Sequence, residues 1–246
     1  MKAKHVAHAL ARNFVAIAFA VAALGGCSGG GESSQPPTAP PASAKILPVT
    51  PVAQQTPVWC WAATAEMVFR YFNLPALNTD YQCGIVAAYG GPQSACFDNC
   101  LNCISPIGGM AQLHTLINGY GIVANQYGFP SRMLSGRLLF NALTMQQVAA
   151  EIDAGRPIIA GISPGGFAYP NFSQHVVLIV GYEINGTLPP RVIVNDPFPY
   201  SLAPFSSQIN PYLVVGGIPT RPGQYSVTYS AFLSPINWAN TIDSLR

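Results

Sequence analysis

The spacing of hydrophobic and polar positions predicts helices in the first part of the chain and strands in the second. Apolar residues recur at helical intervals over 62–72, 110–118 and 144–155. Short, mostly apolar runs predict strands at 157–163, 175–182, 191–196 and 224–232. The third helix begins with a Thr144–Gln147 capping box, and Gly155 ends it. Helices followed by antiparallel strands predict an α+β domain.

The strands at 175–182 and 191–196 are joined by a segment rich in turn residues. It contains Asn185-Gly186 and Pro189-Pro190, which favour an antiparallel hairpin. A hairpin brings the start of one strand beside the end of the other, so His175 and Asp196 become neighbours. A carboxylate bonded to an imidazole fixes its tautomer and stabilises its cation, as a catalytic base requires. The alternatives are a histidine packed for structural reasons and an aspartate that only starts a turn.

Cys60 lies between Trp59 and Trp61 at the start of the first predicted helix. Unpaired N–H groups and the helix dipole favour negative charge there, so a thiol ionises more easily. Gln54 and Gln55 precede it closely, and an amide that folds back would donate to a developing oxyanion. A lone cysteine is usually a buried structural residue, but the imidazole and carboxylate downstream supply the rest of one chemistry. We expect both tryptophans to pack around the helix start.

Three short patches resemble the papain-like cysteine peptidases, above all the bacteriocin-leader and secreted effector peptidases of bacteria. They are Gln54 with Cys60-Trp-Ala-Ala, the run His175-Val-Val-Leu-Ile-Val-Gly-Tyr, and Val-Asn-Asp196-Pro. The resemblance implies a helical half that carries the nucleophile, a sheet half that carries the base, and an active site in the cleft between them.

The resemblance also implies a role for each matching residue. Cys60 would be the nucleophile, His175 the general base and acid, Asp196 the residue that orients it, and Gln54 the oxyanion donor. Gln55 remains an alternative to Gln54, and Asn195 remains an alternative to Asp196. Residues 76–108 and 197–224 match no pattern of the family.

The N-terminal 26 residues are typical of an export signal. Lys2, Lys4 and Arg12 precede an apolar run over 14–24, which is too short to span a bilayer. The run ends in Leu-Gly-Gly-Cys27, which resembles a bacterial lipoprotein processing site. We expect a mature chain that begins at a lipidated Cys27; the alternative is an ordinary secretory signal cleaved near residue 26.

A tether follows the processing site. Residues 27–48 are rich in Gly, Ser and Pro and cannot build a core, so they would hold a peptidase domain, 49–246, away from a membrane. The domain length suits one core. We expect a monomer, exported to the cell envelope and facing the periplasm or the cell surface.

The charge balance excludes one class of partner. Charged residues are 8% of the chain, against about a quarter in typical proteins. Without the three basic residues of the signal, eight basic residues face nine acidic ones. No basic patch remains for nucleic acid. The expected partners are a protein or peptide substrate and, through the lipid, a membrane, with no cofactor or metal.

Four further cysteines crowd into a Gly-, Asn- and Pro-rich stretch: Cys83, Cys96, Cys100 and Cys103. Outside the cytoplasm an even number of cysteines predicts two disulfides, and three connectivities are open. A zinc site is the alternative, because two cysteines separated by two residues are a common half-site.

The sequence therefore predicts an exported, membrane-tethered thiol peptidase. One alternative is a Cys-His amidase or transamidase that acts on cell-wall peptides, since the same groups perform that chemistry. Another is a catalytically silent binding module.

Overall fold

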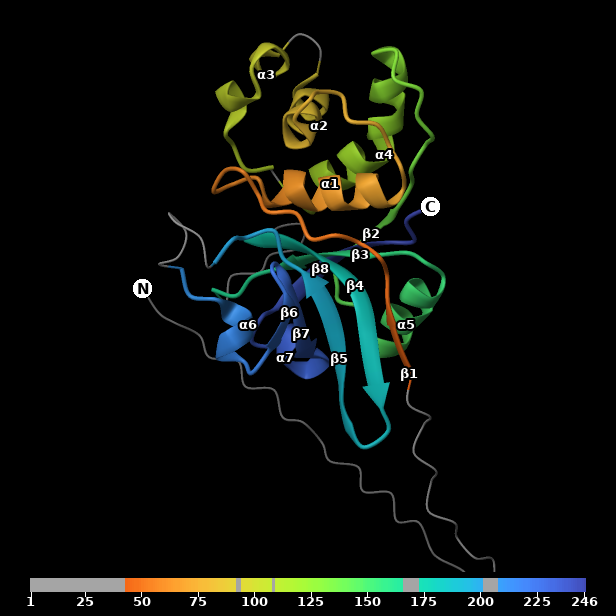
Figure 1. The fold of residues 1–246 in the computed structure, drawn as a ribbon, viewed down its shortest axis with the longest axis vertical. Coiled ribbons are helices and arrows are strands. Elements are labelled where there is room, and N and C mark those ends of the chain that lie inside the picture. The colour runs from red at the N-terminus through yellow and green to blue at the C-terminus, as the bar shows by residue number, and fades with distance from the viewer. Residues whose placement is uncertain (1–42, 92–93, 108, 166–172, 201–207) are drawn as a thin grey trace, which may run out of the picture. The chain divides into compact units, whose positions relative to one another are not determined.

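The computed structural model describes residues 43–91, 94–107, 109–165, 173–200 and 208–246. The predicted signal at 1–26, Cys27 and the tether up to residue 42 lie outside these residues. The described chain folds as α+β, as expected (Figure 1).

Helices dominate the first half of the domain. They are α1 (Cys60–Tyr71), α2 (Tyr81–Gly90), α3 (Ala95–Asp98), the 3-10 helix η1 (Cys100–Cys103) and α4 (Met110–Gln126). Helix α1 lies between the other helices and the sheet (Figure 1). It is buried over most of its length, and the Thr64 hydroxyl donates to the carbonyl of Val176 in the sheet, at 3.0 Å. The segment 76–108, which matches no pattern of the family, thus contains three short helices within its described residues.

The strands form one antiparallel sheet, to which the start of the domain contributes β1 and the second half contributes the rest. Its strands are β1 (Ser43–Ile46), β2 (Arg137–Leu139), β3 (Ile158–Ile162), β4 (His175–Asn185), β5 (Leu188–Asn195), β6 (Ile218–Arg221), β7 (Gln224–Thr228) and β8 (Trp238–Asp243). The order is β2-β8-β3-β4-β5-β7-β6. Strand β4 is long enough to pair with β3 along its first part and with β1 along its last. The buried strands β3, β4 and β5 carry the aliphatic core.

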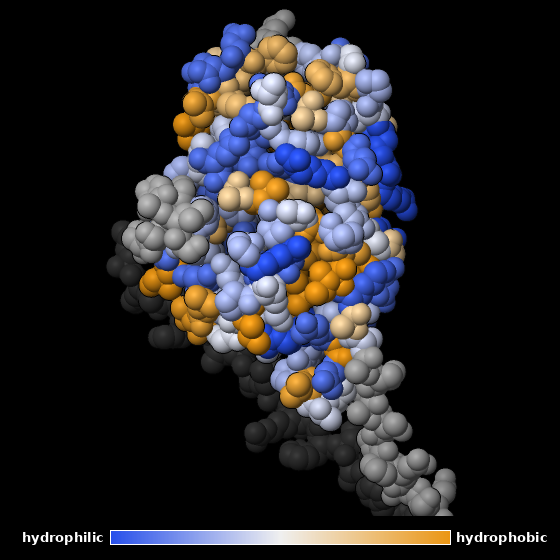
Figure 2. Space-filling view, viewed as in Figure 1, coloured by the Kyte–Doolittle hydropathy of each residue, from blue (hydrophilic) through white to orange (hydrophobic). Residues whose placement is uncertain are grey.

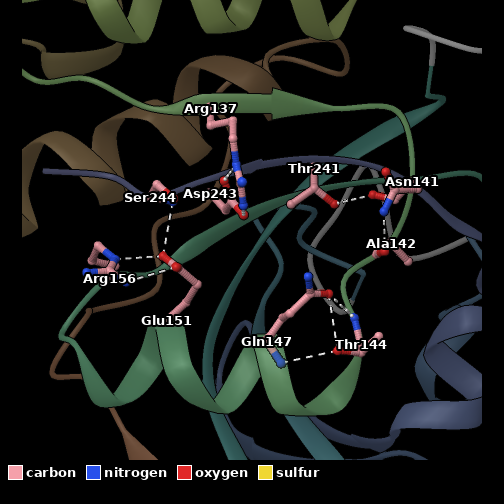
Figure 3. Close-up of polar contacts among 10 residues, drawn as sticks. All are labelled: Arg137, Asn141, Ala142, Thr144, Gln147, Glu151, Arg156, Thr241, Asp243 and Ser244. Carbon is pink, nitrogen blue, oxygen red and sulfur yellow. Dashed lines mark hydrogen bonds and ion pairs between the residues drawn. The ribbon is translucent and has the colours of Figure 1, made fainter.

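Three further helices accompany the sheet: α5 (Met145–Asp153), α6 (Pro211–Val214) and α7 (Tyr229–Leu233). The capping box that predicts α5 is present, because Thr144 and Gln147 bond each other's backbone N–H groups (Figure 3). The Glu151 carboxylate of α5 binds Arg156 and accepts from the backbone N–H of Ser244 at 3.0 Å, which ties the end of the chain to α5.

Several boundaries differ from the sequence prediction. The expected strand at 224–232 is a strand only to Thr228, whose side chain caps α7 by accepting from the N–H of Ala231. Residues 43–46 form β1 and are not part of the tether that the composition predicts up to residue 48, because the edge of β4 beyond β3 offers them backbone partners. The prolines at 189–190 belong to β5 rather than to the turn.

Candidate active site

Cys60 is the first residue of α1, and its side chain is partly exposed. The indoles of Trp59 and Trp61 are buried on either side of it, which confirms the packing expected for them. Trp59 donates through Nε1 to the carbonyl of Cys103 at 3.4 Å, and Trp61 packs on the ring of Tyr89. Two buried anchors therefore fix the helix start and leave the thiol at the surface, beside the unpaired N–H groups of the first turn.

The β4–β5 hairpin brings His175 and Asp196 together, as the sequence predicts. Asn185 pairs with Leu188 across a two-residue turn, and Leu178 pairs with Asn195 near the other end. His175 begins β4, while Asp196 follows the last residue of β5. The distance from His175 Nε2 to Asp196 Oδ1 is 2.6 Å.

Asp196 is held by more than the imidazole. Its side chain is fully buried, and Oδ1 also accepts from the backbone N–H of Phe198 at 2.7 Å. The Tyr200 hydroxyl donates to Oδ2 at 3.3 Å. Several donors therefore hold this carboxylate in one orientation in a buried place.

Two opposing effects act on the pKa of His175. Burial disfavours the imidazolium and lowers its pKa, but the nearby Asp196 carboxylate and the Cys60 side chain raise it. The second influence wins, and the pKa of His175 is raised to about 10. Because Asp196 contacts Nε2, Nδ1 is the ring nitrogen that remains for an interaction with Cys60. The site therefore favours the imidazolium form of His175.

Cys60 and His175 line one cavity of about 290 Å³. Other walls include Val58, Phe198 and Tyr200. No described residue of its lining carries a charged side chain apart from protonated His175.

The two candidate glutamines point in different directions. Gln54 is 3% exposed, and its Nε2 donates to the carbonyl of Thr56 at 2.8 Å, while its backbone N–H donates to Pro197. Gln55 is exposed and donates to Asp80 Oδ2 at 2.7 Å. Gln54 is thus linked to the residue that follows Asp196, but neither glutamine is among the residues that line the cavity.

Asn195 does not face the imidazole. It is fully buried, donates from Nδ2 to the carbonyl of Val49 at 3.0 Å and contacts the side chain of Gln224. It ties the segment before α1 to β5. Of the two adjacent candidates, only Asp196 bonds His175.

Three aromatic residues near the site were missed by sequence reasoning. Phe198 presents an edge-on ring to His175, at 6.1 Å between centroids. Burial, and then the charge of Asp196, raise the pKa values of Tyr200 and Tyr212, so both remain neutral hydroxyls. For Phe198 and Tyr200 the available signal was their close spacing after the Asp-Pro pair, and Tyr212 had no such signal.

The cysteine cluster forms two disulfides, which confirms that prediction and settles the connectivity. Cys83 pairs with Cys100 and Cys96 pairs with Cys103, with Cα–Cα distances of 5.1 and 5.4 Å. The four sulfurs are thus bonded to each other rather than placed as zinc ligands. Nowhere in the described ranges do three or more His, Cys, Asp or Glu side chains gather as a metal site would require.

Residues 46–210 match the model of the Peptidase_C39 like family. The match covers more than half of the chain, so the protein belongs to this family and is a papain-like cysteine peptidase at the level of the family. A comparison with curated proteins finds no match.

Two observations bear on location. Disulfides are typical of proteins outside the cytoplasm and point to an extracellular or periplasmic protein. Across the part of the chain that the structure describes, no helix combines the length and apolarity needed to cross a membrane.

Proposed function

We propose that the protein is an exported, membrane-tethered thiol peptidase that uses Cys60, His175, Asp196 and Gln54. One observation carries the proposal: the imidazole of His175 bonds Asp196 at 2.6 Å and also interacts with Cys60, in a cavity at the start of α1. This arrangement stabilises a thiolate–imidazolium pair, the resting form of a thiol nucleophile. The site would then lie in a cleft between the helical half and the sheet half.

The reaction follows from that pair. The Cys60 sulfur forms a bond to the peptide carbonyl carbon, and the π electrons move to the oxygen. His175 gives its proton to the nitrogen of the leaving amine as the C–N bond breaks. His175 then takes a proton from water, whose oxygen attacks the thioester carbon; the C–S bond breaks and the thiolate returns.

The oxyanion is assigned two donors. One is the backbone N–H of Cys60, which is free at the helix start. The other is Gln54, whose amide nitrogen carries two hydrogens and uses one for the Thr56 carbonyl. The second hydrogen remains for the oxyanion.

The decisive experiment compares substitutions at the two described histidines. We expect His175→Ala to abolish peptide hydrolysis and to lower the iodoacetamide alkylation rate of Cys60 near neutral pH, because the ion pair is lost. Cys60→Ala should be inactive, and Asp196→Ala should be less damaging than either, since it transfers no proton. His114→Ala is the matched control and should stay within a few-fold of wild type.

Three results would argue against the proposal. Wild-type activity in folded His175→Ala would rule out the proposed catalytic triad. Release of muropeptides without cleavage of ordinary peptides would favour a cell-wall amidase. A Cys60 thiol no more reactive than a free cysteine, together with no hydrolysis, would favour a binding module.

A further inference from the structure

The cavity beside Cys60 continues into a second hollow of about 520 Å³. The two share Pro164, Gln208, Ile209 and Pro211, so a chain lying across the thiol reaches both. The second hollow adds Gly165, Val214, Val215, Pro235 and Ile236 to the wall. The residues that line this second hollow define what is called here the α6 pocket.

Apart from Gln208, the side chains that line the α6 pocket are apolar, and the pocket is open to solvent. Ile209 is 78% exposed and Val214 is 70% exposed, and the surface near α6 shows apolar residues (Figure 2). No described residue of its lining carries a charge. Covering such aliphatic groups is favourable by roughly 25 cal/mol per Å², whereas a charged group placed there would lose water without gaining a partner.

The wall formed by α6 is firmly attached to the catalytic side of the sheet. The Asn210 side chain caps the helix, and Tyr212 points inward, fully buried and stacked on Tyr225 at 4.5 Å. Val214 lies on the same helix but faces outward. The helix begins after residue 210, where the family match ends, so this wall belongs to a part of the chain outside the match.

We propose that the α6 pocket is a subsite that receives an apolar side chain of the peptide being cleaved. This inference rests on the proposed function, because the occupant is fixed by continuity with the cavity that holds Cys60 and His175. It adds a substrate class: peptides with an aliphatic or aromatic residue close to the scissile bond.

The test uses internally quenched peptides that carry Leu, Phe, Asp or Lys at each of three positions on both sides of the scissile bond. At one position we expect Leu or Phe to raise kcat/KM by about tenfold or more over Asp and Lys. Val214→Asp should remove this preference and improve the Lys peptide at the same position. The alkylation rate of Cys60 should not change, since the catalytic pair is untouched.

Leu213→Asp is the matched control. Leu213 is on the same helix and 53% exposed, but it lines a neighbouring hollow that contains neither Cys60 nor His175. This variant should keep the apolar preference. Equal loss in both variants, an unchanged preference in Val214→Asp, or cleavage without any preference would overturn the inference while leaving the peptidase proposal intact. If wild type cleaves no peptide at all, the proposed function fails, and the inference fails with it.

Discussion

At the residue scale, the two described histidines differ in what surrounds them. His175 bonds a buried carboxylate, whereas His114 Nε2 lies 2.8 Å from the carbonyl oxygen of Gly136 and contacts Asn118 on its own helix. A backbone carbonyl holds an imidazole in place but does not supply a full negative charge. The surroundings of His114 are therefore those of a structural residue.

The raised pKa of His175 gives a pH dependence with a definite sign. Its pKa is about 10 in the folded protein and about 6.5 in an unfolded chain, so the folded state holds the proton more tightly. The stabilisation is complete below about pH 6.5 and is lost as pH rises through about 10. We expect the urea midpoint of wild type to fall across this window more than that of His175→Gln. Urea midpoints that change equally with pH in the two proteins would contradict the assignment of this raised pKa to His175.

Gln82 is a positioning residue for the segment that carries Gln54. Its buried side chain donates to the carbonyl of Ala53 at 2.9 Å and accepts from the N–H of Gln55 at 3.1 Å, so it holds both neighbours of Gln54. It also donates to the buried Glu66 carboxylate of α1 at 3.1 Å. These bonds connect the Gln54 segment to two helices.

Replacing Gln82 separates oxyanion stabilisation from thiol reactivity. Gln82→Met keeps the length but removes the bonds, so we expect kcat to fall about tenfold, less than the about 10² to 10³ that loss of an oxyanion donor costs. Alkylation of Cys60 by iodoacetamide forms no oxyanion and should keep its rate. Gln55→Ala, at the exposed neighbour, is the control and should change neither. If the alkylation rate of Cys60 in Gln82→Met falls together with kcat, the effect of this substitution is only structural.

At the element scale, one disulfide joins α2 to η1 and the other joins α3 to η1. The bonded residues are 17 and 7 positions apart, so closing the loops stabilises the fold by about 3 and about 2 kcal/mol. The carbonyl of Cys103 also accepts from Trp59, next to the thiol. The two disulfides therefore support the start of α1.

Alkylation of the exported protein under denaturing, non-reducing conditions tests this arrangement. We expect peptide mapping to find one alkylated cysteine in the described domain, Cys60, because the other four are bonded. Adding reductant before alkylation should expose all five. Four further alkylated thiols without reductant, with stoichiometric zinc in the native protein, would restore the zinc alternative.

At the scale of the whole molecule, the proposed anchor is separate from the catalytic chemistry. We expect metabolic labelling with an alkyne fatty acid to mark wild type and not Cys27→Ser, because that thiol is the proposed acceptor. The catalytic variant Cys60→Ala should be labelled like wild type, which makes it the control for expression and export. Equal labelling of wild type and Cys27→Ser, or no labelling of either, would contradict the lipoprotein proposal.

The sequence by itself determined the features whose causes are local. Helix α1 and the capping box of α5 follow from residues a few positions apart. Short runs of mostly apolar residues predict β4 and β5. The hairpin expected around Asn185-Gly186 then brings His175 near Asp196, although the pairing of β4 with β5 shifts its register twice along the strands. For the same reason the pair of His175 and Asp196, which is the centre of the candidate site, was predictable from the sequence.

Only the tertiary structure decided features that depend on distant partners. The pairing of Cys83 with Cys100 is set by how α2 and η1 pack, and β1 exists because β4 extends beyond β3. The partners of the two glutamines also depend on the tertiary structure, because the Gln54 side chain donates to the carbonyl of Thr56 and the Gln55 side chain donates to Asp80. Such choices depend on contacts between remote segments, which the spacing of residues along the chain does not encode.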